Sequence, residues 1–121
     1  MQSVLVVEDS DDLRESYARW LETVGYRVLQ ARDGAEALKQ ASEFPPDLVL
    51  LDVSLPGMDG YAVAEHWQHD PGMASVPVIV LSGRSGDEFE RNSHGAGAVL
   101  ALTKPCTPDV ILAAIRGALT T

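Results

Sequence analysis

Short apolar runs alternate with segments of helical periodicity from one end of this chain to the other. The third run, Leu48–Leu51, is uniformly apolar, which is typical of a strand that helices cover on both faces. This alternation predicts an α/β protein with a doubly wound parallel sheet, two helices on one face and three on the other. The expected strands are residues 4–7, 26–31, 47–51, 76–81 and 98–102. The expected helices begin after Ser10, at Gly34 and after Gly60, and span Ser85–His94 and Pro108–Leu119.

The length and composition of the chain suit one domain. It has 121 residues, of which 45% are apolar, so it can bury a sizeable core. We find no linker, no internal repeat and no low-complexity segment. We therefore expect residues 1–121 to form a single domain, with no effector domain attached.

The formal net charge of −9 argues against two classes of partner. A DNA-binding surface neutralises phosphates with Lys and Arg, and an anionic membrane surface attracts the same residues. No apolar stretch approaches the roughly 20 residues of a membrane span, and no basic segment precedes the first apolar run as it does in a signal peptide. These features predict a cytoplasmic protein that binds neither nucleic acid nor membrane directly.

Polar residues mark the carboxyl ends of four predicted strands. Asp9, Asp52, Ser82 and Lys104 lie at these ends, and Glu8 precedes Asp9. In parallel α/β sheets, ligands bind beyond this edge. Three crowded carboxylates need a cation, and a divalent metal ion is the usual answer. A carboxylate beside a metal ion, an ammonium and a hydroxyl is equipped to accept a phosphoryl group.

Six short motifs occur in a fixed order along the chain. They are Val6-Val7-Glu8-Asp9, Asp33-Gly34-Ala35-Glu36-Ala37-Leu38, the segment from Leu51-Asp52 to Met58-Asp59-Gly60, Leu81-Ser82-Gly83, Gly95-Ala96-Gly97-Ala98 and Lys104-Pro105. In these motifs the chain resembles the receiver domains of bacterial two-component response regulators, and the resemblance extends over the whole chain. The resemblance implies a flavodoxin-like fold, in which five parallel strands lie in the order 2-1-3-4-5 with helices on both faces.

The resemblance implies a metal site for Mg²⁺ or Mn²⁺. Asp9 and Asp52 would ligate the ion directly, together with the backbone carbonyl of Ser54. Glu8 would act mainly through metal-bound water. The ion would offset the repulsion among the acids and neutralise charge on a transferring phosphoryl group.

The resemblance also implies roles in phosphoryl transfer. Asp52 would accept the group from a phosphohistidine or a small acyl phosphate. Lys104 would pair with one phosphoryl oxygen as a mobile point charge, and Ser82 would hydrogen-bond another. The family has a cis peptide bond at the position of Lys104-Pro105, so the same isomer is expected here.

The resulting hypothesis is a phosphorylation-driven switch, not an enzyme that turns over external substrates. Its partners would be a sensor histidine kinase or a histidine phosphotransfer protein, and a downstream protein. An alternative is an aspartyl-phosphate-forming hydrolase with a related α/β core, but such enzymes carry a second acid where this chain has Ser54. A constitutive interaction domain is the other alternative. It predicts the loss of Asp52 or Lys104, and both are present.

One position departs from the family pattern. Receiver domains usually carry an aromatic residue three positions before the lysine of the fifth strand, and this chain has Ala101 there. A switch based on an inward-swinging ring at this position is therefore not expected. The residue after Lys104-Pro105 is often Phe in the family and is Cys106 here, which points the same way. We interpret Cys106, the single cysteine, as a small packing residue.

Two further residue pairs are candidate sites. His66 and His69 are three positions apart on a predicted helix and can in principle share a metal ion. With no cysteine or further histidine nearby, we interpret them as solvated surface residues. Trp20 and Trp67 follow the helical spacing of apolar residues, so we expect them in or beside the core and not in a ligand platform.

Overall fold

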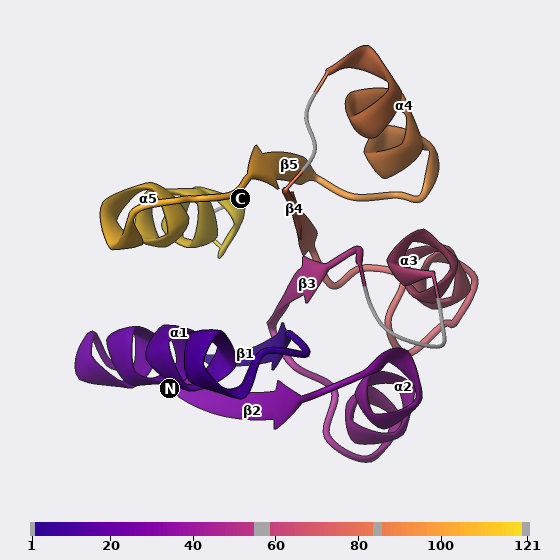
Figure 1. The fold of residues 1–121 in the computed structure, drawn as a ribbon. Coiled ribbons are helices and arrows are strands. Elements are labelled where there is room, and N and C mark those ends of the chain that lie inside the picture. Colours follow the sequence, from indigo (N-terminus) through magenta and orange to yellow (C-terminus); the bar gives the residue numbers. More distant parts are fainter. Residues whose placement is uncertain (1, 55–58, 84–85, 120–121) are drawn as a thin grey trace.

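A computed structural model describes residues 2–54, 59–83 and 86–119 of the chain. It contains one five-stranded parallel sheet with the order β2-β1-β3-β4-β5, which confirms the predicted fold (Figure 1). The strands are β1 (Ser3–Val7), β2 (Arg27–Ala31), β3 (Leu48–Asp52), β4 (Val78–Ser82) and β5 (Leu100–Thr103). The helices are α1 (Asp11–Thr23), α2 (Gly34–Glu43), α3 (Gly60–Gln68), α4 (Asp87–Gly95) and α5 (Pro108–Leu119).

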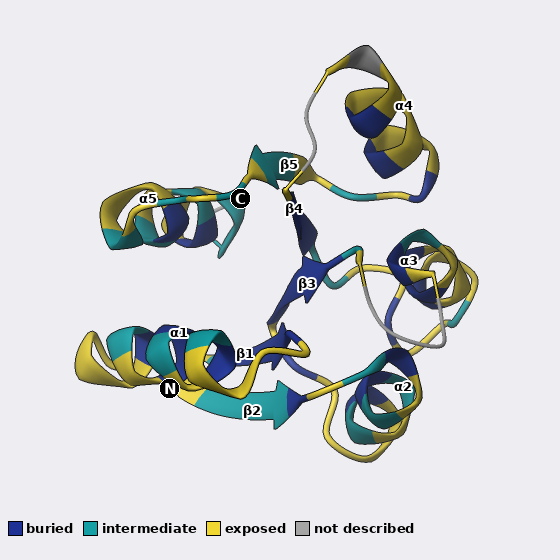
Figure 2. Cartoon of the chain, viewed as in Figure 1, coloured by how far each residue is buried: buried dark blue, intermediate teal, exposed yellow. Residues whose placement is uncertain are grey.

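The helices cover the sheet on both faces, two on one side and three on the other, as predicted. α1 and α5 lie together on one face, and α2, α3 and α4 lie on the opposite face (Figure 1). The central strands β1, β3 and β4 are buried along almost their whole length, as their dark colour in Figure 2 shows. None of the helices in the described part of the chain is long and apolar enough to cross a bilayer.

Side-chain caps fix where several helices begin. The predicted cap Ser10 accepts a hydrogen bond from the Leu13 N–H at 3.3 Å and so starts α1. Asp33 accepts from the Glu36 N–H at 2.8 Å at the start of α2, and Asp59 caps α3 in the same way. The first of these caps matters for function, because it directs the chain away from the sheet immediately after Glu8 and Asp9.

The strand ends differ slightly from the sequence-based boundaries. Asp52 and Ser82 were expected just after their strands, but each is the last residue of its strand, because the ladders continue to Asp52↔Leu81 and Ser82↔Thr103. β5 begins at Leu100 and not at residue 98. Val99 is 58% exposed and touches the sheet through its N–H, which donates to the Val78 carbonyl at 2.9 Å.

Two further predictions, one about a helix and one about a loop, fall partly on residues that the structure does not describe. The weak helix expected at Ser85–His94 is present as α4, but it begins at Asp87, and Ser85 lies outside the described residues. Of the loop expected between Ser54 and Gly60, residues 55–58 also lie outside them. Gly60 itself belongs to α3 and approaches Val53 so closely that a Cβ there would overlap the Val53 Cα. This contact ties the start of α3 to the residue that follows Asp52.

Candidate functional site

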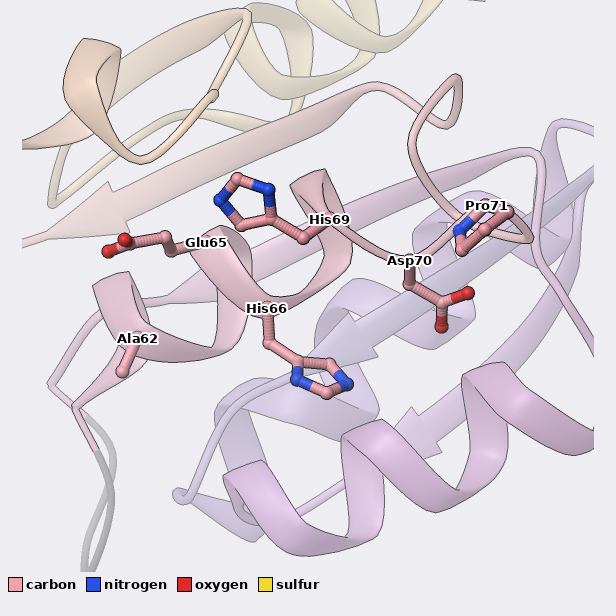
Figure 3. A pocket seen from close by; sticks show the side chains of 6 residues that line it. All are labelled: Ala62, Glu65, His66, His69, Asp70 and Pro71. Carbon is pink, nitrogen blue, oxygen red and sulfur yellow. The ribbon is translucent and has the colours of Figure 1, made fainter.

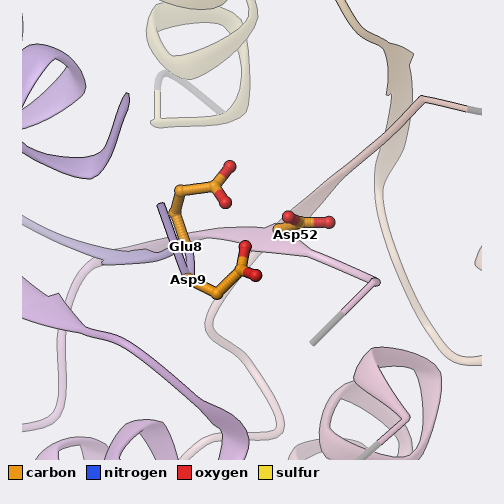
Figure 4. Close-up of side chains that lie close together, drawn as sticks. All are labelled: Glu8, Asp9 and Asp52. Carbon is orange, nitrogen blue, oxygen red and sulfur yellow. The ribbon is translucent and has the colours of Figure 1, made fainter. Parts of the chain in front are cut away.

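Three carboxylates meet at the carboxyl edge of the sheet. Glu8 and Asp9 follow β1, and Asp52 ends the neighbouring strand β3, where Val7 pairs with Leu51. One oxygen of each carboxylate lies within 4.8 Å of the other two, and the three side chains gather in Figure 4. Glu8 and Asp52 are buried, whereas Asp9 is exposed. The strand register therefore brings together the acids that the sequence predicted.

The Lys104 ammonium lies between the two buried carboxylates. Its Nζ is 2.6 Å from Glu8 Oε1 and 3.1 Å from Asp52 Oδ2, and its side chain is 22% exposed. The backbone N–H of Lys104 donates to the Ser82 carbonyl at 2.7 Å, which joins the ends of β5 and β4. The peptide bond between Lys104 and Pro105 is cis, as the resemblance implied.

Backbone N–H groups hold the remaining oxygens of these two carboxylates. The Ser54 N–H donates to Asp52 Oδ1 at 2.8 Å, and the Ser10 N–H donates to Glu8 Oε2 at 3.2 Å. Each buried acid thus receives one hydrogen bond from the ammonium and one from the backbone. These four hydrogen bonds are what allows two like charges to be buried side by side.

Three carboxylates share this site with the Lys104 ammonium, and burial has the largest effect on their electrostatics. Burial raises the pKa of Glu8 from 4.5 to about 7, a hydrogen bond with Asp9 acts in the same direction, and the Lys104 ammonium opposes the rise. Burial alone would lower the pKa of Lys104, but its hydrogen bond to Glu8 and the charge of Asp52 outweigh burial and raise that pKa. Oxygen ligands that converge around excess negative charge fit a hard divalent cation such as Mg²⁺ or Mn²⁺.

Ser82 lies beside this cluster at the end of β4. It is buried and lines a hollow of about 200 Å³ together with Ser54 and residues from α3 and α4, among them Tyr61 and Phe89. The hollow adjoins the carboxyl edge where Asp52 ends the neighbouring strand. The Ser82 hydroxyl therefore lies in the same row of strand ends as Asp52, as the sequence predicted.

The structure also shows where His66 and His69, the alternative candidates for a metal site, lie. His66 and His69 are both exposed and point to different sides of α3 in a surface pocket (Figure 3). In the described part of the chain, the only group of three or more potential metal ligands is that of Glu8, Asp9 and Asp52.

The two tryptophans and the cysteine make packing contacts or backbone hydrogen bonds, as the sequence predicted. Trp67 is buried in the core, and Trp20 packs edge to face on Tyr17 with ring centroids 5.5 Å apart. The Cys106 thiol donates to the Thr103 carbonyl at 2.9 Å, and burial raises its pKa, so the reactive thiolate is disfavoured.

One candidate functional residue, Arg14, was not predicted from the sequence. This arginine is buried on α1, and its Nη1 donates to the Glu8 carbonyl at 3.0 Å. A signal for it was present, since Arg14 stands four positions before Ala18 and seven before Leu21, on the stripe that faces the sheet. Helical periodicity of apolar residues alone does not select a charged residue on that stripe.

Comparison with known proteins matches this geometry to a family. The model of the response regulator receiver domain matches residues 4–116. The chain is 39% identical over 118 residues to the transcriptional regulatory protein KdpE of Mycobacterium tuberculosis, which covers 98% of this chain and 51% of that protein. It is 34% identical over 113 residues to the phosphate regulon regulator PhoB of Escherichia coli, covering 93% of this chain and 49% of that protein.

Solved structures agree with this match. The chemotaxis protein CheY4 of Vibrio cholerae superposes with a TM-score of 0.94 at 29% identity, over 98% of this chain and 99% of that one. The chain spans about half the length of the curated relatives it matches. The order of the strands, the acids at their carboxyl edge and the match over residues 4–116 lead to one conclusion. This chain belongs to the receiver domain family of the two-component response regulators.

Proposed function

We propose that Asp52 is the phosphoryl acceptor of this receiver domain. A carboxylate oxygen of Asp52 attacks the phosphorus of a phosphohistidine on a sensor histidine kinase or a phosphotransfer protein. The P–N bond breaks, the imidazole nitrogen leaves with the electron pair and takes up a proton, and an aspartyl phosphate forms. The observation that supports this role is the position of Asp52, buried at the end of a central strand with the Lys104 ammonium 3.1 Å away.

The residues that would hold the metal ion follow from the acidic cluster. Asp9 and Asp52 would supply carboxylate oxygens, Ser54 its backbone carbonyl, and Glu8 a contact through metal-bound water. Bound there, Mg²⁺ or Mn²⁺ would neutralise charge on the phosphoryl oxygens. The proximity of the three carboxylates, within 4.8 Å of one another, supports the acidic members of this ligand set, and the Ser54 carbonyl is included from the resemblance to the family.

Lys104 and Ser82 would then respond to the new charge. Phosphorylation adds about −1.5 to −2 charge and strong acceptor oxygens at Asp52. Lys104 would exchange its contacts with Glu8 and Asp52 for a phosphoryl oxygen, and the Ser82 hydroxyl would donate to another. The backbone hydrogen bond between these two residues, at 2.7 Å, supports a joint response.

The proposed biological role is that of a switch. Residues 1–121 would act as one cytoplasmic receiver unit that catalyses only its own phosphorylation and dephosphorylation. The phosphorylated form would bind a downstream protein, with no direct contact to nucleic acid or membrane. A hydrolase acting on external substrates is disfavoured, because Ser54, which stands where that class has its second acid, offers Asp52 an N–H donor and no general acid.

The acceptor role is tested by incubating the protein with acetyl phosphate and Mg²⁺ and measuring intact mass. We expect one phosphoryl group on the wild type and none on Asp52→Asn, because the amide is a poor nucleophile. Asp12→Asn is the matched control, since Asp12 is an exposed acid on α1, and it should be labelled like the wild type. Stoichiometric labelling of Asp52→Asn would disprove the assignment.

A further inference from the structure

Arg14 is a buried cation that the phosphoryl-transfer scheme does not use. Its side chain is only 9% exposed, and its guanidinium donates to three acceptors from different parts of the fold. Nη1 donates to the Glu8 carbonyl at 3.0 Å, Nη2 to Asp11 at 2.6 Å and Nε to Gln30 of β2 at 3.2 Å. The planar fork of a guanidinium allows this three-way contact, which a lysine ammonium on a flexible stem does not reproduce.

The hydrogen bond from Arg14 to the Glu8 carbonyl helps to fix the backbone of the segment that carries Glu8 and Asp9. The N–H of Glu8 donates to the Ala31 carbonyl of β2 at 3.1 Å, and its carbonyl accepts from Arg14. Both peptide groups that flank the Glu8 Cα are therefore fixed, and the second of them leads directly into Asp9. The orientation of the Asp9 side chain depends on that peptide.

We propose that Arg14 is a positioning residue for the metal site. It holds the peptide between Glu8 and Asp9 so that the Asp9 carboxylate faces Glu8 and Asp52 before any cation arrives. This inference rests on the proposed function, because the site it serves is the Mg²⁺ site of phosphoryl transfer. Groups that orient metal ligands in this way typically contribute 10–100-fold to metal affinity.

The charge of Arg14 makes the proposal distinguishable from a simple electrostatic effect. A positive charge bonded to a residue of the metal site repels Mg²⁺, so its removal should by itself tighten Mg²⁺ binding. Loss of positioning has the opposite sign, since a mobile Asp9 must be ordered when the ion binds. The direction of the change in affinity therefore separates the two effects.

The test is isothermal titration calorimetry of Mg²⁺ with the unphosphorylated protein, at a temperature where each variant is folded by circular dichroism. Arg14→Met should raise the Mg²⁺ dissociation constant by about tenfold. Arg14→Lys keeps the charge but loses the fork, and it should also weaken binding. Arg19→Met removes a charge from the exposed side of the same helix and should leave the constant within about twofold of wild type, given screening by solvent.

Three results would overturn the proposal: equal or tighter binding by Arg14→Met, wild-type affinity in Arg14→Lys, or equal weakening by Arg19→Met. If Arg14→Met does not fold, Arg14→Lys decides alone. The readout is metal binding and not phosphorylation. A wild type that binds Mg²⁺ but is not labelled by acetyl phosphate would therefore disprove the proposed function without touching the role of Arg14.

Discussion

Lys104 satisfies two buried acids at once, and this shapes the resting site. Its Nζ is closer to Glu8 than to Asp52, at 2.6 and 3.1 Å, so its nearer partner is not Asp52, the proposed phosphoryl acceptor. Removing one member of such a buried group is costly, because the remaining charges lose their partner. The lysine is thus the counter-ion of the metal-free protein as well as a candidate ligand of the phosphoryl group.

The two acids after β1 should contribute unequally to metal binding. Both oxygens of Glu8 are engaged, one by Lys104 and one by the Ser10 N–H, whereas Asp9 is exposed. We expect Asp9→Ala to raise the Mg²⁺ dissociation constant by about tenfold or more, and Glu8→Ala to raise it less. Calorimetry would measure both, with Asp12→Ala as an unaffected control. A larger loss in Glu8→Ala, or equal affinity in all variants, would contradict this order.

The sequence predicted which residues form the site but not how they pair. Strand-end positions are enough to bring Asp52, Ser82 and Lys104 to one edge, because parallel strands share that edge. The preference of Lys104 for Glu8 depends on how far the ammonium reaches across the sheet, which no spacing encodes. Arg14 was not predicted for a similar reason: Asp11 is its neighbour on α1, but its other two acceptors, the Glu8 carbonyl and Gln30, lie outside that helix and are brought to it by the fold.

Helix α4, near the site, has few of the local features that stabilise a helix. It begins after Gly86, which has a φ of 110° and no side-chain cap, and a second glycine, Gly97, with a φ of 88°, follows its end. Its main buried apolar side chain is Phe89, which lines the same hollow as Ser82. Because Ala101 carries only a methyl group, no ring at that position can take up space that Ser82 vacates.

We therefore predict that phosphorylation is propagated through α4. With the phosphoryl mimic beryllofluoride, hydrogen exchange of amides in residues 83–95 should change by on the order of fivefold or more, through displacement or ordering of this segment. The Asp52→Asn variant lacks the carboxylate that binds beryllofluoride, so its hydrogen exchange should not change. Protection changes confined to α3, with residues 83–95 unaffected, would rule this route out.

At the level of elements, the sequence predicted each helix and strand, and the errors are at their ends. The apolar run that begins at Ala98 suggested two further strand residues, but Val99 is largely exposed and β5 starts at Leu100. Apolar composition indicates that a segment is strand-like, whereas pairing to β4 decides where the ladder starts. The strand order itself came from the resemblance, because alternation alone does not order the strands.

For the whole molecule, the crowded acids should make stability depend on pH. The pKa of Glu8 is about 7 in the folded protein and 4.5 ordinarily, so between these values the native state binds more protons than the unfolded state. The free energy of unfolding should then fall as pH rises from about 4.5 to about 7, by on the order of 3 kcal/mol at most, and level off above. Urea melts in EDTA would measure this.

Glu8→Gln provides the control for this pH dependence. The amide does not titrate, so the variant should lose the decline between pH 4.5 and 7 that Glu8 causes. Saturating Mg²⁺ should also reduce the decline in the wild type, because an ion that binds only the native state stabilises it most where Glu8 is ionised. If the free energy of unfolding fell equally with pH in the wild type and in Glu8→Gln, both in EDTA, Glu8 would not be the source of the pH dependence.

The pairing of Lys104 with Glu8 joins residues that are 96 positions apart. The ribosome synthesises β1 long before β5. In the nascent chain Glu8 and Asp52 are therefore present before Lys104, which is their counter-ion in the folded protein. Closing a loop of this length comes late in folding, since its entropy must be offset by contacts already made. A stalled or clipped chain that lacks β5 would hold Asp52 but not the lysine that completes its surroundings. If Asp52 is the phosphoryl acceptor proposed above, only chains whose synthesis and folding have reached the far edge of the sheet would present a complete site, and unfinished copies would not respond to a phosphoryl donor.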